Sequence, residues 1–405
     1  MAFLMLLCYA FFMNLLNSMS RCRRIASAFF MLSLFFVMTY SFISCSHEDK
    51  VESEPEQLSE KLVIVFHFPD GLGDNSYNDI LAYGIHKAAK EHGLLPYDVN
   101  PSDWDDAKAK IDKVFDSYRS LIGLEENADI PVLLIFANSG YLDVLKDADI
   151  SEKIASASDS FSYLLFESTE LPETDLPYLS TVYMPLYGAS YLAGLASKSL
   201  LSSKENPRVV ALLANDFMSP LLDALSGFSD GYGVSYEKIY NQNDSSEHAM
   251  AAMNSASFVV ESICSDDDPY GFNSSGTTYE IANNNNFNHF DLYFPVCGGS
   301  IHGLLRYNRE RGDDSFYTVG MDSDLRPYSS QVPFSVVKHV DKAAEKCIKQ
   351  WLDEGKIDRY QHLGLEEGYT ELVISSGYEE LLSQTVQENL SAAIEKENRY
   401  YEINN

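Results

Sequence analysis

The stretch Asp70-Gly71-Leu72-Gly73-Asp74-Asn75-Ser76-Tyr77-Asn78-Asp79 follows the apolar run 62–66 and precedes a segment with helical periodicity at 80–91. This order predicts a strand, a loop and a helix, the first unit of an α/β sheet. The loop would lie at the carboxyl end of its strand, where open α/β sheets bind ligands. Its glycines let the backbone approach a ligand, and its acidic, amide and hydroxyl side chains offer several hydrogen-bonding groups.

The length and charge of the chain limit its architecture and its partners. With 405 residues the chain exceeds one ordinary domain, so two lobes are expected. It carries 60 acidic against 29 basic residues, a formal net charge of −31. Such a field repels nucleic acid and anionic lipid surfaces, and nucleic acid is therefore not an expected partner.

The N-terminal region has the features of an export signal. Arginines at 21, 23 and 24 lead into the uncharged, apolar run 25–44. The tetrad Phe42-Ile43-Ser44-Cys45 resembles a lipobox, in which the cysteine becomes the lipidated first residue of the mature protein. We therefore expect lipidation at Cys45. The alternative is that the apolar run 25–44, which is long enough to cross a bilayer, stays in place as a membrane-spanning anchor. Either reading places the folded part outside the cytoplasm, tethered in the cell envelope at the periplasmic or outer-membrane surface.

The remaining cysteines, histidines and acidic runs do not form a catalytic or metal motif. Cys264, Cys297 and Cys347 have no CxxC spacing, which argues for buried thiols rather than disulfides or a zinc site. The acidic run 266–268 lacks EF-hand spacing. HExxH, GxSxG and P-loop patterns do not occur, so we expect neither an enzyme nor a cofactor or metal.

The order of predicted elements sets the expected domain organisation. Strands and helices alternate in the first half, which predicts a parallel sheet. Residues 103–121 have helical periodicity, with Trp104 as a packing residue, and 247–262 also predicts a helix. The expected N-terminal parts are a signal segment at 1–44, with its true start at Met19, and a lipid-anchored tether at 45–60. A first lobe at 61–182 and a second lobe at 183–333 follow, and the second lobe carries a loop insertion at 264–288. The chain then returns to the first lobe at 334–356 and ends in a C-terminal segment at 357–405, mainly in the second lobe.

Six motifs occur along the chain in the order of one family's signatures. They lie at 71–79, 191–196, 295–300, 319–324, 335–341 and 364–369. In this set the chain resembles the basic membrane protein family, lipid-anchored substrate-binding proteins of ABC transporters similar to purine nucleoside receptors. The resemblance implies a type I periplasmic-binding-protein fold: two doubly wound α/β lobes with parallel sheets, three crossings between them, and a ligand cleft. It also implies an ABC permease as partner.

The resemblance assigns roles to five residues. Tyr77 would stack on a purine ring, and Asn78 would hydrogen-bond the base. Asp322 would accept hydrogen bonds from the ribose hydroxyls with Lys338 beside it, and Gly298 would bring the backbone close to the sugar. A salt bridge between Asp322 and Lys338 that organises the hinge is the alternative to ligand contact for this pair.

Two more polar residues are candidates because of their positions. Asp74 lies in the opening loop, where it would contact the ligand or stabilise the start of the helix. Asn138 follows the buried strand predicted at 131–137, so it would lie at the same edge of the sheet.

The chain departs from the family pattern at two places. Phe68 stands where the family has an aspartate, and Asp70 is the candidate to replace that carboxylate. A second stacking ring is expected from the other lobe near 241–244, where the chain has no phenylalanine and Tyr240 is the nearest aromatic residue.

These observations favour a monomeric, tethered solute-binding protein for a neutral small molecule. A purine nucleoside is the expected ligand, because a neutral purine needs a stacking face and a few oriented polar groups. A surface sensor or binding lipoprotein of the same fold, with a modified nucleoside or a sugar as ligand, is the alternative.

Overall fold

The computed structural model describes residues 61–69, 71–121, 130–157, 160–169, 179–215, 218–235, 237–239, 257–284, 290–312 and 316–404. The predicted signal segment, Cys45, the tether, Asp70, Tyr240 and positions 241–244 lie outside these residues. Within them, no helix combines the length and the apolar character needed to cross a membrane.

The first lobe is built on a parallel sheet in the order β13-β5-β4-β3-β1-β2. Its strands are β1 (Leu62–Phe66), β2 (Leu95–Val99), β3 (Val132–Phe136), β4 (Phe161–Phe166), β5 (Leu179–Tyr183) and β13 (Tyr360–His362). Strands β1 and β3 are buried along their whole length because helices cover both faces of the sheet, as their continuous apolar sequences require.

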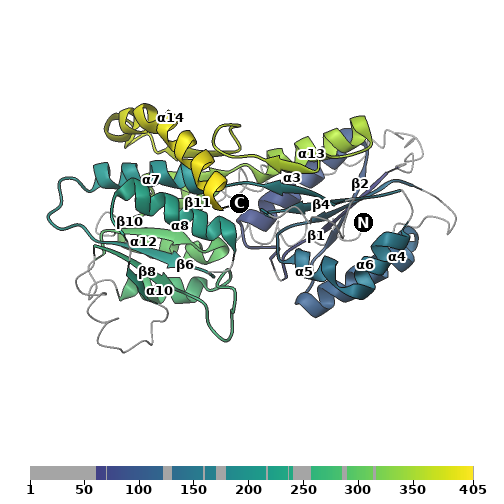
Figure 1. The fold of residues 1–405 in the computed structure, drawn as a ribbon. Coiled ribbons are helices and arrows are strands. Elements are labelled where there is room, and N and C mark those ends of the chain that lie inside the picture. Colours follow the sequence, from purple (N-terminus) through teal and green to yellow (C-terminus); the bar gives the residue numbers. More distant parts are fainter. Residues whose placement is uncertain are drawn as a thin grey trace, which may run out of the picture. The chain divides into compact units, whose positions relative to one another are not determined.

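The two faces of this sheet carry different helices. Helices α3 (Tyr77–His92) and α13 (Val340–Glu354) pack on one face. Helices α4 (Trp104–Leu121), α5 (Tyr141–Lys146) and α6 (Ala148–Ser156) pack on the other (Figure 1). Helix α3 begins at Tyr77, inside the stretch 70–79, so the opening loop before Tyr77 joins the end of β1 to the first covering helix.

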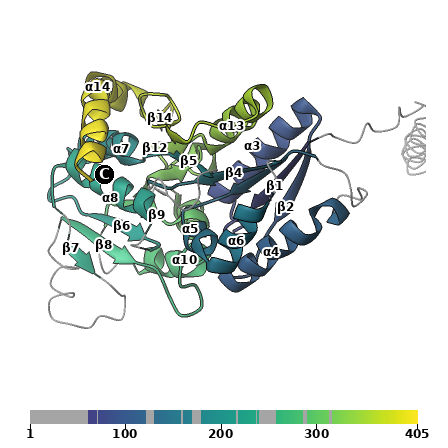
Figure 2. The ribbon, with the colours of Figure 1, turned by 45° about the vertical axis from the view of Figure 1, so that its right-hand side comes forward.

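The second lobe repeats the arrangement with a smaller parallel sheet, in the order β10-β9-β6-β8-β7. Its strands are β6 (Val209–Leu213), β7 (Glu237–Ile239), β8 (Phe258–Ser262), β9 (Leu292–Val296) and β10 (Tyr317–Thr318). Helices α7 (Tyr187–Leu200) and α8 (Ser219–Tyr232) pack on one face, and α10 (Ser275–Asn283) packs on the other (Figure 2). Helix α12 (His302–Arg311) packs on the same face as α10. A 3₁₀ turn, η1 (Gly298–Ile301), joins β9 to α12.

A third sheet joins the lobes. It contains β11 (Gly320–Asp322), β12 (Phe334–Lys338) and β14 (Thr370–Ile374), with β12 parallel to β11 and antiparallel to β14. Over the described residues the chain crosses between the lobes three times: from β5 to α7, from β12 to α13, and from β13 to β14. The last helix, α14 (Glu379–Asn404), then packs against α7 (Figures 1 and 2).

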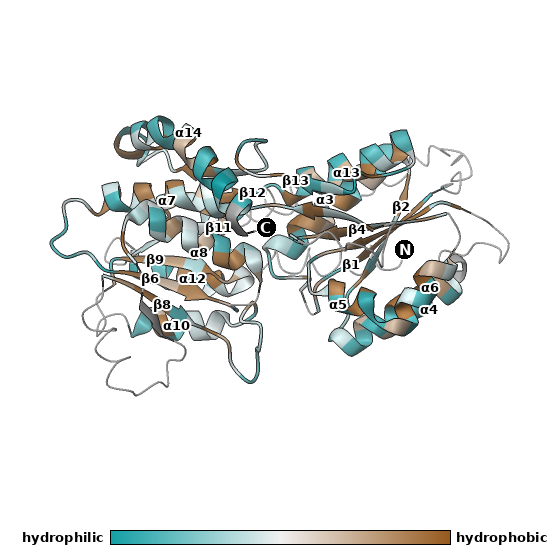
Figure 3. Cartoon of the chain, viewed as in Figure 1, coloured by the Kyte–Doolittle hydropathy of each residue, from teal (hydrophilic) through white to brown (hydrophobic). Residues whose placement is uncertain are grey.

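Glycines allow α7 and α8 to pack unusually closely. A Cβ added at Gly194 would lie 2.3 Å from the Phe228 carbonyl oxygen, and one at Gly227 would lie 2.1 Å from the Tyr187 carbonyl oxygen. Figure 3 shows that apolar residues concentrate in the strands, whereas α13 and α14 carry many hydrophilic residues.

Two predicted segments differ from the structure. The described end of the predicted helix 247–262 is the strand β8, because Phe258, Val259 and Val260 form an aromatic and β-branched apolar run that fits a buried strand. The segment 264–288, predicted as a loop, contains α10, whose nine residues bury only Thr278, Ile281 and Ala282. So narrow an apolar stripe leaves little helical periodicity in the sequence.

Candidate functional site

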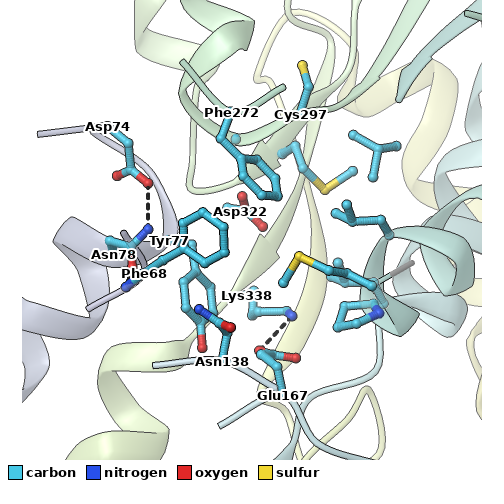
Figure 4. A pocket seen from close by; sticks show the side chains of 17 residues that line it. Phe68, Asp74, Tyr77, Asn78, Asn138, Glu167, Phe272, Cys297, Asp322 and Lys338 are labelled. Carbon is cyan, nitrogen blue, oxygen red and sulfur yellow. Dashed lines mark hydrogen bonds and ion pairs between the residues drawn. The ribbon is translucent and has the colours of Figure 1, made fainter. Parts of the chain in front are cut away.

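The strand ends of both lobes surround one pocket of about 640 Å³, counted out to its open mouth. The sequence candidates that line it are Asp74, Tyr77, Asn78, Asn138, Gly298, Asp322 and Lys338. Other lining residues include Met218 and Met321. Phe68, Glu167 and Phe272 also line the pocket (Figure 4). Parallel strands end at the same edge of each sheet. The pocket therefore brings together side chains from the ends of six strands: β1, β3, β4, β9, β11 and β12.

The opening loop is held by its own hydrogen bonds. The Asp74 carboxylate accepts from the Ser76 backbone N–H at 2.8 Å and from Asn78 Nδ2 at 3.1 Å. Asn78 Oδ1 in turn accepts from the Phe68 backbone N–H at 3.3 Å. Burial raises the pKa of Asp74, and the hydrogen bonds from Ser76 and Asn78 oppose that rise. Asp74 and Asn78 therefore shape the loop while lining the pocket.

Tyr77 is fixed at the start of α3 with its ring on the pocket wall. Its hydroxyl donates to the Ala137 carbonyl oxygen at 2.8 Å, just beyond the end of β3. Lys338 Nζ lies 5.6 Å from the centre of the ring. Burial raises the pKa of Tyr77 well above its ordinary value, and the nearby Glu167 and Asp322 carboxylates act in the same direction. The hydroxyl therefore stays protonated, and the ring is held in one orientation.

A buried ion pair joins the first lobe to the hinge strand β12. Lys338 Nζ donates to Glu167 Oε1 at 2.9 Å, and both side chains are 3% exposed. Burial raises the pKa of Glu167, and the charge of Lys338 opposes that rise. The salt bridge between Asp322 and Lys338 that was the alternative to ligand contact is not formed, because Lys338 pairs with Glu167 instead. Glu167 was missed, although it directly follows the apolar strand β4, the same signal that pointed to Asn138 after β3.

Asp322 connects the lobes at the end of β11. Its backbone has a φ of 64°, in the left-handed region that residues other than glycine seldom adopt. The carboxylate accepts a hydrogen bond from the Ser76 hydroxyl of the first lobe at 2.9 Å. Burial raises the pKa of Asp322, and the charge of Lys338 and the hydrogen bond from Ser76 oppose that rise.

Gly298 and Asn138 lie on opposite walls. Gly298 has a φ of 48°, and a Cβ there would lie 3.1 Å from the Phe272 ring, so backbone reaches the pocket surface. Asn138 Oδ1 accepts from the Gly140 N–H at 2.8 Å. Its buried Nδ2 has no hydrogen-bond partner among the described residues. This amide is therefore an available donor on the pocket wall.

The second lobe contributes an aromatic ring at a different position from the predicted one. Phe272 lines the pocket, and its ring meets that of Phe68 edge to face, with centroids 5.5 Å apart and an interplanar angle of 86°. Phe272 belongs to the segment predicted as an aperiodic loop, so sequence patterns provided no signal for it. Together with Tyr77, these rings form an aromatic wall that includes residues from both lobes (Figure 4).

Comparison with known proteins identifies the family of this chain. A family model described as ABC transporter substrate-binding protein, PnrA-like (Bmp), matches residues 61–405. The chain belongs to this family. Its members are binding proteins rather than enzymes, and this PnrA-like protein accordingly takes a small-molecule ligand and has an ABC permease as partner. No curated protein gives a significant match.

Solved structures show the same fold at low sequence identity. A solute-binding protein of an ABC transporter system from Aeropyrum pernix K1 is 18% identical with a TM-score of 0.57, and the match covers 84% of this chain and 89% of that chain. A transcriptional activator of the comK gene from Bacillus halodurans is 13% identical with a TM-score of 0.55, covering 82% and 97%. A sugar transporter from Clostridium phytofermentans is 13% identical with a TM-score of 0.50, covering 78% and 99%. The predicted periplasmic-binding-protein fold is confirmed, and the ligand is not decided by these matches.

Proposed function

We propose that this PnrA-like protein binds a purine nucleoside in the pocket between its lobes and delivers it to an ABC permease. The observation that carries the proposal is the convergence of Tyr77, Asp322 and Lys338 with a ring of the second lobe, Phe272, on one pocket. A flat base needs aromatic faces, and stacking contributes about 1–3 kcal/mol per base. A carboxylate such as that of Asp322 can accept hydrogen bonds from both hydroxyls of a vicinal diol.

The charges and free donors of the pocket favour a neutral ligand. Burial raises the pKa of Asp74, Glu167 and Asp322, so added negative charge would be costly there. The positive charge of Lys338 is already paired with Glu167. The unpartnered Asn138 Nδ2 would donate to an acceptor atom of the base. In this proposal Asp70, Asp74, Asn78 and Gly298 complete the site as predicted from the sequence.

The tethering and the use of the two lobes also belong to this proposal. Lipidation at Cys45 would anchor the protein in the cell envelope, and residues 45–60 would let the folded part reach the permease. Residues 61–182 with 334–356 would form one lobe, entered through β12 of the joining sheet, and 183–333 with most of 357–405 would form the other. The protein would work as a monomer without nucleic acid, since a single chain contains both walls of the pocket.

A different ligand, such as a modified nucleoside or a sugar, is the second candidate. Phe68 supplies a ring where the family has a carboxylate, and the amide of Asn78 is engaged by Asp74 and the Phe68 backbone. Both features reduce the number of polar groups available to a standard purine base. A protein that senses such a ligand at the cell surface, rather than transporting it, would use the same pocket.

Ligand screening tests the choice between these candidates. Thermal shift and calorimetry would be run against purine nucleosides, free bases and sugars, and mass spectrometry would identify any ligand retained through purification. Stabilisation by nucleosides alone supports the first candidate, and stabilisation by sugars alone supports the second. A flat response across the nucleosides would contradict the nucleoside proposal.

Substitutions in the pocket locate the site. Tyr77→Ala and Asp322→Ala should each weaken binding by about 1–3 kcal/mol without unfolding the protein, because each removes a stacking face or a hydrogen-bonded carboxylate. Two variants outside the pocket are matched controls. Tyr83→Ala removes an exposed ring of α3, and Asp324→Ala removes a carboxylate that pairs with Arg326. Equal calorimetric affinity in the pocket variants and the controls would remove Tyr77 and Asp322 from the site.

A further inference from the structure

A further contact between the lobes lies outside the ligand pocket. Trp104, at the start of α4 in the first lobe, donates its indole N–H to the Tyr270 hydroxyl at 2.6 Å. Tyr270 belongs to the second lobe, in the segment between β8 and α10. Neither side chain lines the pocket, and both are half-buried where the two lobes meet. This hydrogen bond therefore joins the lobes without occupying the space of a ligand.

Trp104 is held firmly on its own lobe. Its ring packs edge to face against Tyr141, with centroids 5.2 Å apart. It also lies so close to Gly140 that a Cβ there would come within 2.6 Å of the indole. The indole therefore has little freedom to turn away from the second lobe.

The backbone segment that carries Tyr270 is fixed within the second lobe. The carboxylate of Asp268 accepts from the backbone N–H groups of Gly271 at 2.9 Å and Asn273 at 2.8 Å. The Ser300 hydroxyl, at the end of η1, donates to the Gly271 carbonyl oxygen at 2.8 Å. These bonds lie within the second lobe, so the segment can keep its shape whether or not the first lobe is close.

Phe68 connects this contact to the pocket. Its ring meets Trp104 at 5.6 Å and Tyr270 at 5.0 Å, with interplanar angles of 89° and 87°. The same ring lines the pocket beside Phe272. A ligand that packs against Phe68 would therefore support the ring on which Trp104 and Tyr270 rest.

We propose that Trp104 and Tyr270 form a latch that stabilises the closed arrangement of the lobes and prolongs the retention of a bound ligand. The Trp104 indole and the backbone that carries Tyr270 are each preorganised on their own lobe, so closing the latch adds only the ordering of the Tyr270 side chain. A contact made only in the closed arrangement shifts the equilibrium toward it by its own free energy. The proposal goes beyond the proposed function, because the latch acts on lobe closure whichever ligand the pocket takes.

The latch is tested in protein freed of ligand by unfolding and refolding. Tyr270→Phe removes the hydroxyl and keeps the ring, and should shift the closed-to-open ratio by about two- to tenfold, the range of one hydrogen bond. Acrylamide quenching of Trp104 fluorescence reports exposure of the indole, in a Trp351→Phe background that removes the only other tryptophan of the sequence. Small-angle scattering reports the separation of the lobes. We expect stronger quenching and a larger radius of gyration, with a greater effect in Tyr270→Ala.

Two further variants make the test specific. Tyr279→Phe removes a hydroxyl of the same lobe that donates to Glu310 at 2.6 Å, and should change neither readout. Trp104→Phe, followed by scattering, should open the lobes as Tyr270→Phe does, and the double variant should show no additional opening.

The outcomes separate the latch from the nucleoside proposal. The latch would be overturned if Tyr270→Phe and Tyr270→Ala both gave the same quenching and scattering as the wild type. Unchanged circular dichroism and melting temperature would show that these variants are folded. These readouts need no ligand, so a failed nucleoside screen leaves them valid. If a nucleoside binds, faster dissociation from Tyr270→Phe than from Tyr279→Phe adds support, and equal dissociation rates would refute the role in retention.

Discussion

A glutamate buried at the hinge should make the protein less stable as the pH rises. Glu397 of α14 is 1% exposed, and its carboxylate accepts the backbone N–H groups of Gly188 at 2.7 Å and Leu365 at 3.0 Å. Gly188 follows the first crossing between the lobes, and Leu365 lies in the third. Burial raises the pKa of Glu397 to about 7, those two N–H groups oppose the rise, and the Asp223 carboxylate adds to it.

The direction of the effect follows from proton binding. The folded protein holds the Glu397 proton more tightly than the unfolded chain, whose glutamate has a pKa of 4.5. The stabilisation by this proton is fully present below pH 4.5 and is lost as the pH rises through about 7. A pKa difference of this size corresponds to about 3 kcal/mol in the free energy of unfolding, of which about 2–3 kcal/mol falls between pH 5 and pH 8.

Glu397→Gln isolates this contribution, because glutamine resembles the protonated carboxyl and does not ionise. Urea denaturation of the wild type and the variant at several pH values from 5 to 8 gives their difference in unfolding free energy. We expect this difference to move in favour of the variant by about 2–3 kcal/mol across that range. Glu395→Gln is the matched control, since Glu395 is exposed on the same helix and pairs with Arg399.

Asp223 also titrates in this range, since burial raises its pKa to about 6 while the hydroxyls of Tyr183 and Tyr401 donate to it. It is present in both proteins, so its own effect largely cancels in the difference. A difference between wild type and Glu397→Gln that is the same at every pH would refute the assignment of a raised pKa to Glu397.

Two other substitutions test the packing that holds the lobes. Lys338→Met should lower the free energy of unfolding by about 3–5 kcal/mol, because it leaves the buried Glu167 carboxylate without its cation; urea denaturation measures the loss, and a loss below about 1 kcal/mol would contradict it. Gly227→Ala should destabilise the second lobe by about 1–3 kcal/mol or more, because the added Cβ would collide with the Tyr187 carbonyl oxygen. An unchanged melting temperature would show that α7 and α8 can separate at no cost.

Much of the site could be predicted because strand ends are visible in the sequence. The apolar strand β1 followed by glycines located the opening loop, and the end of the next buried strand located Asn138 after β3. Asp322, the last residue of β11, was assigned by the family resemblance. Glu167 follows β4 as Asn138 follows β3, and was open to prediction. Phe272 was not, because it lies in an irregular segment whose path is set by hydrogen bonds to Asp268 and Ser300 rather than by periodicity.

The sequence by itself determined the alternation of strands and helices, the edge of each sheet where ligand groups gather, and the family signatures that imply three crossings. These depend on hydrophobic periodicity and on glycine positions, which are local properties of the chain. Only the tertiary structure decided that Lys338 pairs with Glu167 rather than with Asp322, and that Trp104 bonds Tyr270 across the lobes. Such pairings join residues more than 160 positions apart, and their geometry exists only once both lobes and the hinge have packed.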